Sequence, residues 1–147
     1  MKEVHMSEME QQTVDLAEYG WNERLDAARR ACGRPDWVPA RVMSEQRHLY
    51  HLLAETGECQ AEVSGRFRAA AGGTGDFPAV GDWVMAQVRS REGSATIHAV
   101  LPRQTRFSRR AAGPRADEQV MAANFDAVLL AMSLNDDYNL RRLERYL

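Results

Sequence analysis

The sequence predicts a mainly β protein whose centre is a small five-stranded barrel, with a helical segment before it and the start of an α/β unit after it. Residues 38–105 contain five short runs in which apolar and polar side chains alternate, separated by residues that favour turns. Five short strands with turn signals between them favour a small barrel or sandwich. An OB-fold is the simplest barrel of this size, although an SH3-like barrel would give the same pattern.

A short amphipathic helix is expected before the barrel. Residues 1–15 are polar and acidic and are expected to form a disordered extension, which places the helical lead-in at residues 16–36. Asn22 can cap the helix, Gly33 can close it in a left-handed conformation, and Pro35 prevents its continuation. The apolar face of this helix consists of Leu25, Ala28 and Cys32. We expect this face to pack on the barrel.

The predicted barrel occupies residues 37–105. Its five strands are expected at Val38–Ser44, His48–Ala54, Cys59–Arg68, Trp83–Arg89 and Ala95–Leu101. Residues 69–78, AAAGGTGDFP, resemble a glycine-rich phosphate loop, but they lack a lysine and precede a strand, so a flexible surface connection is expected there. Gly81 and Asp82 are expected to form a tight turn before the fourth strand.

Positive charge is concentrated in the middle of the chain. The formal net charge of the 147 residues is -2, yet residues 64–115 carry nine basic and three acidic side chains. A local positive field of this kind favours a polyanionic partner, because arginine pairs with phosphate oxygens through two parallel hydrogen bonds. The alternative is a solvated surface loop. The candidate RNA-binding residues are Arg66 and Arg68, expected on the outward face of the third strand, and Arg103, Arg106, Arg109, Arg110 and Arg115, which follow the fifth strand.

Four aromatic side chains could stack on RNA bases or pack inside the protein, and each needs its own interpretation. Tyr19 and Trp21 are expected to pack on the barrel and not to stack on bases, because aromatic residues mostly act as buried anchors. Phe67 has the inward register of the third predicted strand and is expected in the core. Phe107 lies between arginines, and it could either stack on a base or anchor the segment that carries it.

The composition excludes several kinds of site. Lys2 is the only lysine, so neither a GxxxxGK[ST] phosphate loop nor an NKxD base-recognition motif can be placed in the body of the chain. Cys32 and Cys59 have no metal-binding spacing and are expected to be reduced thiols of a cytoplasmic protein. The histidines lack metal-binding spacing too, and no apolar run is long enough to span a membrane. No catalytic, cofactor-binding or metal-binding residue is expected.

The last part of the chain has a different pattern. Residues 106–122 are expected to be a basic linker, and residues 123–147 the start of a second domain. The apolar run at residues 127–134 fits a strand buried on both faces, and Asn139 can cap a helix after it. A parallel strand and its crossover helix need a second strand, so a truncated α/β domain is expected. The chain is expected to be a monomer, or a weak dimer that associates through apolar surface exposed on this truncated unit.

Several segments of the sequence resemble one known family. They are GWNERL, VSGRFR, AVGDWV, VLPRQTRFSRRAAG, EQVMAANFDAVLL and NLRRLERYL, in this order from Tyr19 to Leu147. Together they resemble the N-terminal part of the ribosome small-subunit-dependent GTPase A family, also called RsgA or YjeQ. That resemblance implies an OB-fold domain followed by a circularly permuted GTPase domain and a zinc-binding domain, whose GTP, Mg and Zn sites would all lie beyond residue 147.

The resemblance also implies a role in late maturation of the small (30S) ribosomal subunit, with the barrel binding its 16S rRNA. On this interpretation the 147 residues form an rRNA-binding OB domain that is inactive as an enzyme by itself, although the full-length family hydrolyses GTP. Two alternatives remain open. The domain could be a protein interaction module that docks on its own GTPase domain or on an acidic partner, or it could be a stand-alone nucleic-acid-binding OB module.

Overall fold

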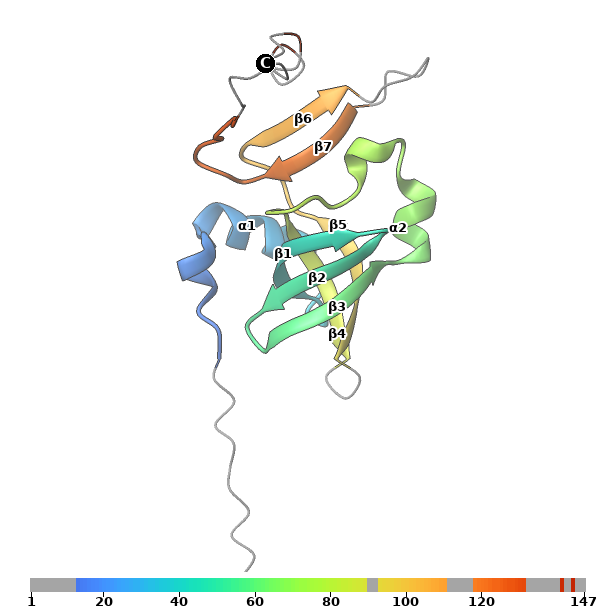
Figure 1. The fold of residues 1–147 in the computed structure, drawn as a ribbon. Helices are drawn as coiled ribbons and strands as arrows, with labels where there is room; N and C mark the ends of the chain where they lie inside the picture. Colours follow the sequence, from blue (N-terminus) through green and yellow to red (C-terminus); the bar gives the residue numbers. More distant parts are fainter. Residues whose placement is uncertain (1–12, 90–92, 111–117, 132–140, 142–143, 145–147) are drawn as a thin grey trace, which may run out of the picture.

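The centre of the molecule is a closed barrel of five strands (Figure 1). The computed structural model describes residues 13–89, 93–110, 118–131, 141 and 144. The barrel strands are β1 (Val38–Gln46), β2 (Leu49–Ala54), β3 (Gly57–Val63), β4 (Trp83–Arg89) and β5 (Ser94–Val100). They follow the order β1-β2-β3-β5-β4, and β4 pairs with β1 to close the barrel. All pairs are antiparallel except β3 with β5. The predicted five-stranded OB-fold is confirmed.

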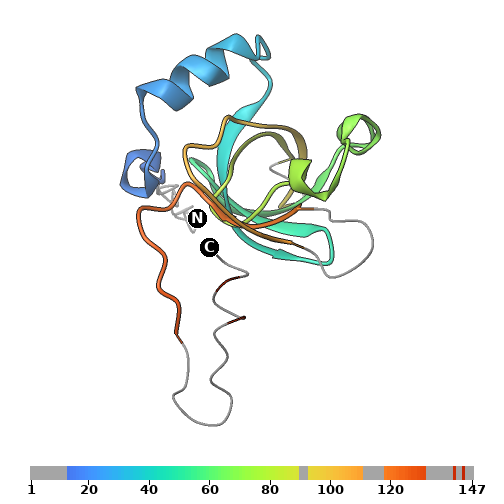
Figure 2. The same ribbon diagram turned by 90° about the horizontal axis from the view of Figure 1, so that it is seen from above.

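The interior of the barrel is filled by the apolar side chains of the alternating runs. On β3, Cys59, Ala61 and Val63 are buried, whereas Gln60 and Glu62 between them are exposed. The view along the barrel in Figure 2 shows the strands surrounding this interior. These side chains form one core inside the barrel, because successive residues of a strand point to opposite faces.

A second core lies outside the barrel, between β4 and the N-terminal segment. β4 is buried on both faces: Val84 and Ala86 belong to the barrel interior, while Trp83 and Met85 pack with Leu16 and Leu25 of the N-terminal segment. Trp21 meets Trp83 edge to face, with ring centroids 5.0 Å apart. The predicted packing of Trp21 on the barrel is therefore confirmed.

The N-terminal segment forms two short helices instead of one. They are η1 (Leu16–Tyr19), a 3-10 turn, and α1 (Glu23–Ala31), separated by Gly20 at φ +93°. The Asn22 side chain accepts a hydrogen bond from the Leu25 backbone N–H at 3.1 Å, as the predicted cap should. Val14 donates its backbone N–H to the Glu55 carbonyl at 2.9 Å, so the described part of the expected extension is attached to the barrel; residues 1–12 lie outside the described residues.

The third strand is shorter than predicted. β3 ends at Val63, and residues Gly65–Ala70 form the helix α2, whose first turn is capped by Ser64: its Oγ accepts from the Phe67 N–H at 3.0 Å. The placement of Arg66 and Arg68 on the outward face of a strand is therefore wrong. A serine before helix-forming residues ends the extended conformation, although apolar and polar residues still alternate there. A further 3-10 turn, η2 (Thr74–Asp76), lies in the glycine-rich connection to β4.

A β-hairpin follows the barrel, within the segment expected to be a linker. Its strands are β6 (Arg106–Arg110) and β7 (Glu118–Ala123), which pair antiparallel. Residues 127–131 have no regular secondary structure and are exposed, so the strand predicted at 127–134 is not formed over these residues. They have no described strand to pair with. Residues 132–140 lie outside the description, and none of the described helices is long and apolar enough to cross a membrane.

Candidate nucleic-acid interface

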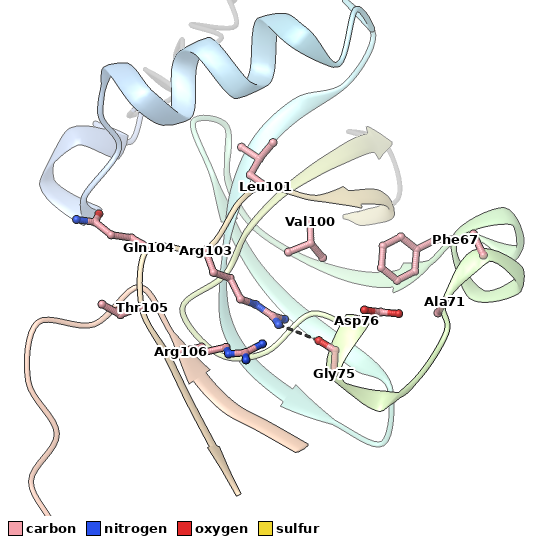
Figure 3. Close-up of a pocket in the computed structure, with 11 residues that line it drawn as sticks. Phe67, Ala71, Gly75, Asp76, Val100, Leu101, Arg103, Gln104, Thr105 and Arg106 are labelled. Atoms are coloured by element: carbon pink, nitrogen blue, oxygen red, sulfur yellow. Dashed lines mark hydrogen bonds between the residues drawn. The ribbon is translucent and has the colours of Figure 1, made fainter. Parts of the chain in front are cut away.

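A cavity of about 630 Å³ lies where the barrel meets the hairpin. One side is formed by α2 and η2, and the other by the segment that leads from β5 into β6 (Figure 3). The lining side chains include Phe67 and Ala70 from α2 with Ala71 just after it, Asp76 from η2, Val100 from the end of β5, and Leu101, Arg103 and Arg106 beyond it. The cavity therefore brings together three segments that are far apart in the sequence, two of which carry predicted RNA-binding arginines.

Arg103 forms part of the wall of this cavity and is fully engaged inside the protein. Its Nη2 lies 2.7 Å from Oδ2 of Asp82, and its Nε lies 2.9 Å from Oδ1 of the same carboxylate. Nη1 donates to the Gly75 carbonyl at 2.8 Å, and Nη2 also donates to the Phe77 carbonyl at 2.9 Å. Asp82 is completely buried and also accepts the Ala79 N–H at 2.8 Å. Arg103 therefore holds η2 and β4 together, and its charge is balanced by Asp82.

The hairpin is fixed to the barrel at Gly81. This residue has φ +87°, and a Cβ atom there would lie 2.1 Å from the carbonyl oxygen of Ala123 at the end of β7. Ala123 donates its N–H to the Val80 carbonyl at 2.9 Å. Next to it, Asn124 donates to the Gly81 carbonyl at 3.1 Å and accepts the Gln104 N–H at 2.8 Å. The close approach of two backbones requires glycine and sets the position of β6 relative to the barrel.

Arg66 and Arg68 lie on α2 beside the cavity. Successive helix residues are about 100° apart, so the two arginines flank Phe67 on opposite sides of the helix. Both are exposed, and neither forms an ion pair with any described residue. Arg68 lies near the barrel residue Tyr50: burial, together with the charge of Glu45, raises the pKa of Tyr50 to about 12, while Arg68 acts in the opposite direction.

Arg106 and Arg109 extend the positive charge along β6. Arg106 is 3.5 Å from the Glu118 carboxylate across the hairpin, with side chains 58% and 44% exposed. Among the described residues, Arg109 donates a hydrogen bond to the Gln119 amide oxygen alone, at 3.4 Å. Exposed pairs of this length contribute little to the stability of the fold. Either arginine can therefore leave its partner and bind another anion. Arg110 ends β6 opposite Glu118, and Arg115 lies outside the described residues.

The two phenylalanines near the arginines have different surroundings. Phe67 is half-buried, packs against the barrel core and meets Phe77 edge to face at 5.9 Å, so its predicted core register is confirmed in part. Phe107 meets Phe125 edge to face at 6.4 Å. This contact favours the second interpretation of Phe107, an anchor between the hairpin and the residues after it.

Sequence reasoning missed Asp82 and Asp76. Asp82 was expected only in a turn, yet it is the buried partner of Arg103, 21 positions away. Asp76 belongs to η2, and its Oδ2 accepts the Gly72 N–H at 2.7 Å. The sequence shows only that both are acidic residues within a basic region. Nothing in it predicts that Asp82 pairs with Arg103 or that Asp76 lines the cavity. The exposed arginines of α2 and β6, namely Arg66, Arg68, Arg106 and Arg109, form a basic rim on the two elements that border the cavity. This rim can bind an anion, while Asp76 places one negative charge inside the cavity.

A second cleft, of about 730 Å³, separates the N-terminal segment from the hairpin. Its two arginines are engaged with backbone carbonyls: Arg24 donates to Pro102 at 3.0 Å and Arg41 to Asn124 at 3.1 Å. Arg41 also lies over the ring of Trp83, 5.6 Å from its centroid. These contacts give both cations a structural role. In the described part of the chain, no three His, Cys, Asp or Glu side chains gather as metal ligands.

Curated proteins match most of this sequence, although no family model matches it. The small ribosomal subunit biogenesis GTPase RsgA of Opitutus terrae is 42% identical over 142 residues, covering 91% of this chain and 39% of that protein. RsgA of Syntrophotalea carbinolica is 39% identical over 142 residues, covering 91% and 38%. RsgA 2 of Lactiplantibacillus plantarum is 37% identical over 135 residues, covering 92% and 37%. The chain thus spans about two fifths of the length of these relatives.

Two solved structures are similar over part of the chain. YjeQ from Thermotoga maritima has a TM-score of 0.45 and 23% identity, covering 61% of this chain and 28% of that one. YloQ, a circularly permuted GTPase, has a TM-score of 0.46 and 18% identity, covering 75% and 35%.

Proposed function

We propose that this chain, which belongs to the RsgA family of small ribosomal subunit biogenesis GTPases, binds the RNA of the small ribosomal subunit through the rim of the cavity between α2 and β6. The relatives are small ribosomal subunit biogenesis GTPases by name, which supports a part for this chain in the assembly of that subunit. Within the chain, the barrel and the docked hairpin act as the RNA-binding module, and 16S rRNA is its ligand. This role places the protein in the cytoplasm.

One observation carries the proposal: four exposed arginines lie on α2 and β6, the two elements that contribute Phe67 and Arg106 to the lining of the cavity. Arg66 and Arg68 come from α2, and Arg106 and Arg109 from β6; their guanidinium groups are solvent-accessible or held only by long, exposed contacts. Exposed guanidinium groups suit the phosphates of a folded RNA, because they can pair with phosphate oxygens without first breaking a strong contact inside the protein. Arg103 supports this surface from within and is not counted among the phosphate contacts.

Binding to purified 30S particles and to 16S rRNA, measured over a series of salt concentrations, tests the proposal. Each arginine that contacts a phosphate contributes about one unit to the slope of log K against log salt concentration. We expect the variant R66Q/R68Q/R106Q/R109Q to bind more weakly and to lose about two to four units of that slope. Unchanged affinity and slope would contradict the proposal.

The double variant R29Q/R30Q is the matched control. Arg29 and Arg30 lie on α1, where both pair with Asp26 at 2.9 and 3.2 Å, away from the cavity. This variant removes two positive charges without touching the rim. We expect its salt slope to equal that of the wild type, which separates specific phosphate contacts from the effect of net charge.

A second role, contact with another protein surface, is favoured by the residues after the hairpin. Leu129 is 95% exposed, and its neighbours Val128 and Leu130 are each 41% exposed. An exposed apolar run of this kind is a candidate contact surface, and in a longer protein its partner would be another domain of the same chain. In the full-length protein, we expect L129S to increase proteolysis of this segment while leaving the RNA affinity unchanged. Equal proteolysis would contradict this second role.

We assign GTP hydrolysis, and the Mg and Zn of the family, to parts of the full-length protein other than these 147 residues. Lys2 is the only lysine, so the chain has no lysine for a phosphate loop in its body. A calorimetric titration with GTP is expected to show no binding to this chain, and measurable binding would overturn the assignment.

A further inference from the structure

We propose that the cavity between α2 and β6 receives one unstacked nucleotide of the bound RNA, with its base against Phe67 and Val100 and its edge on the Asp76 carboxylate, and that this nucleotide is preferentially a guanosine. This inference rests on the proposed function and specifies the ligand of the same site. The volume of about 630 Å³ lies within the ordinary range of small-molecule sites, about 300–1,000 Å³.

The apolar wall of the cavity is held in place before any ligand arrives. Phe67 is half-buried and fixed at its edge by Phe77, with an angle of 73° between the rings. Val100 is half-buried and packs against the barrel core. Figure 3 shows Phe67 and Val100 entering the cavity from α2 and from the end of β5. A fixed ring beside an aliphatic side chain provides the surface on which unstacked RNA bases pack.

The polar group available to read a base is Asp76. The guanidinium of Arg103 is committed to Asp82 and to the carbonyls of Gly75 and Phe77, so it adds rigidity to the wall and little net charge. The Asp76 side chain is exposed and, among the described residues, accepts one hydrogen bond, from Gly72. A carboxylate has about four lone-pair sites, so it can accept further N–H donors.

Guanine is the base whose edge best suits a carboxylate. Its N1–H and N2–H donors lie side by side and can pair with the two oxygens of Asp76, whereas adenine, cytosine and uracil place an acceptor beside their donor. The negative charge of Asp76 also keeps the phosphate out of the cavity. The phosphate would instead lie at the rim, where Arg106 can exchange its long contact with Glu118 for it.

Fluorescence anisotropy with short single-stranded RNAs tests this inference. The probes are four octamers that are identical except for one central A, C, G or U. We expect the wild-type chain to bind the G-containing probe about fivefold or more tightly than the others, and D76N to reduce this preference below about twofold. The salt slope should stay unchanged in D76N, because no phosphate contact is lost.

The matched control is E62Q, which removes one exposed carboxylate from β3 and should leave the preference for G intact. F67L tests the stacking wall, and we expect it to weaken binding of all four probes about tenfold. Because Phe67 also packs on the core, quenching of a fluorescent guanine analogue that keeps N1–H and N2–H, placed at the central position of the RNA, gives a second readout in the wild-type chain. Strong quenching supports a stacked base, and its absence contradicts one.

The outcomes separate the inference from the function on which it rests. Salt-dependent binding that is equal for the four probes, or a preference for G that survives in D76N, overturns the guanosine site and leaves the RNA-binding role standing. Absence of binding to RNA of any sequence, including 30S particles, overturns both.

Discussion

Arg103 and Asp82 form a buried ion pair that joins the barrel to the segments around it. The Nη2–Oδ2 distance is 2.7 Å, and the side chains are 16% and 0% exposed. The arginine also donates to Gly75 and Phe77, and the carboxylate accepts the N–H of Ala79, so all three guanidinium nitrogens and both carboxylate oxygens form hydrogen bonds. The only strongly buried carboxylate of the described chain is therefore used to fix the glycine-rich connection against β4.

Replacing Asp82 by Asn should strongly destabilise the protein. The amide has nearly the same shape, but it leaves the guanidinium of Arg103 buried without a compensating charge. Breaking a buried pair in this way costs about 3–5 kcal/mol. We expect the free energy of unfolding, measured by urea titration, to fall by about that amount in D82N.

The exposed pair of Arg106 and Glu118 provides the control for this measurement. Because these atoms are 3.5 Å apart and largely in solvent, R106Q should change the free energy of unfolding by less than about 1 kcal/mol. Equal losses of stability in D82N and R106Q would show that the Asp82 pair does not hold the junction.

Replacing Gly81 by Ala should detach the hairpin from the barrel. The new Cβ atom would lie 2.1 Å from the Ala123 carbonyl oxygen, so the two backbones must separate. We expect a loss of about 3 kcal/mol or more, measured by urea titration, with faster hydrogen exchange of the Ala123 amide.

The variant G57A is the control for G81A, because it introduces the same backbone strain without the steric overlap. Gly57 has φ +106°, similar to the φ of +87° at Gly81, but no atom lies within 4 Å of a Cβ placed there. G57A should therefore cost only the strain of a left-handed alanine, about 1 kcal/mol, and should leave the exchange of the Ala123 amide unchanged. Similar effects of both variants would argue against a tight contact at Gly81.

The barrel could be predicted because each strand carries its own signal. β4 runs from Trp83 to Arg89, the predicted bounds, and the other four strands lie where alternation placed them, with shifts at their ends. On β3 the alternation reflects burial of every second side chain, a pattern that can be recognised within the strand itself, whereas β4 is buried on both faces along its first half. The positions of the five barrel strands could therefore be predicted from patterns within each strand.

The site was harder to predict because its parts depend on tertiary contacts. The sequence pattern continues past Val63 although the chain turns into α2 at Ser64, so Arg66 and Arg68 were assigned to a strand. Arg103 looked like the other arginines of its segment, and only the position of Asp82, 21 residues earlier, identifies it as structural. Charge density indicated the region that carries the candidate site, but it could not separate buried from exposed arginines.

His98 should make the protein sensitive to mild acid. Its ring is stacked on Trp37 with centroids 4.5 Å apart, and its Nε2 is buried without a hydrogen-bond partner among the described residues. Burial lowers the pKa of His98, while nearby Asp36 raises it and Arg34 lowers it. The unfolded chain then binds the proton more readily, so stability is complete above about pH 6.5 and declines as the pH falls through the folded-state pKa.

H98F keeps an aromatic ring on Trp37 and removes the titrating group. We expect the free energy of unfolding to fall less between pH 7 and pH 5 in this variant than in the wild type. The difference between the two proteins isolates His98 from the carboxylates that titrate lower. Identical pH profiles would rule out this role for the histidine.

Tyr50 should limit stability in alkaline solution. It is 1% exposed inside the barrel, and burial is the largest of the causes that raise its pKa to about 12. Because the unfolded chain releases the phenolic proton near pH 10, the stabilising effect is complete below pH 10 and is lost as the pH rises toward 12. Between pH 9 and pH 11 the wild type should lose about 1 kcal/mol more than Y50F, measured by urea titration. Burial also raises the pKa of the Cys59 thiol, but that group is present in both proteins, so it cancels in the comparison. A Y50F profile parallel to that of the wild type across this range would show that the phenol does not titrate as a buried group.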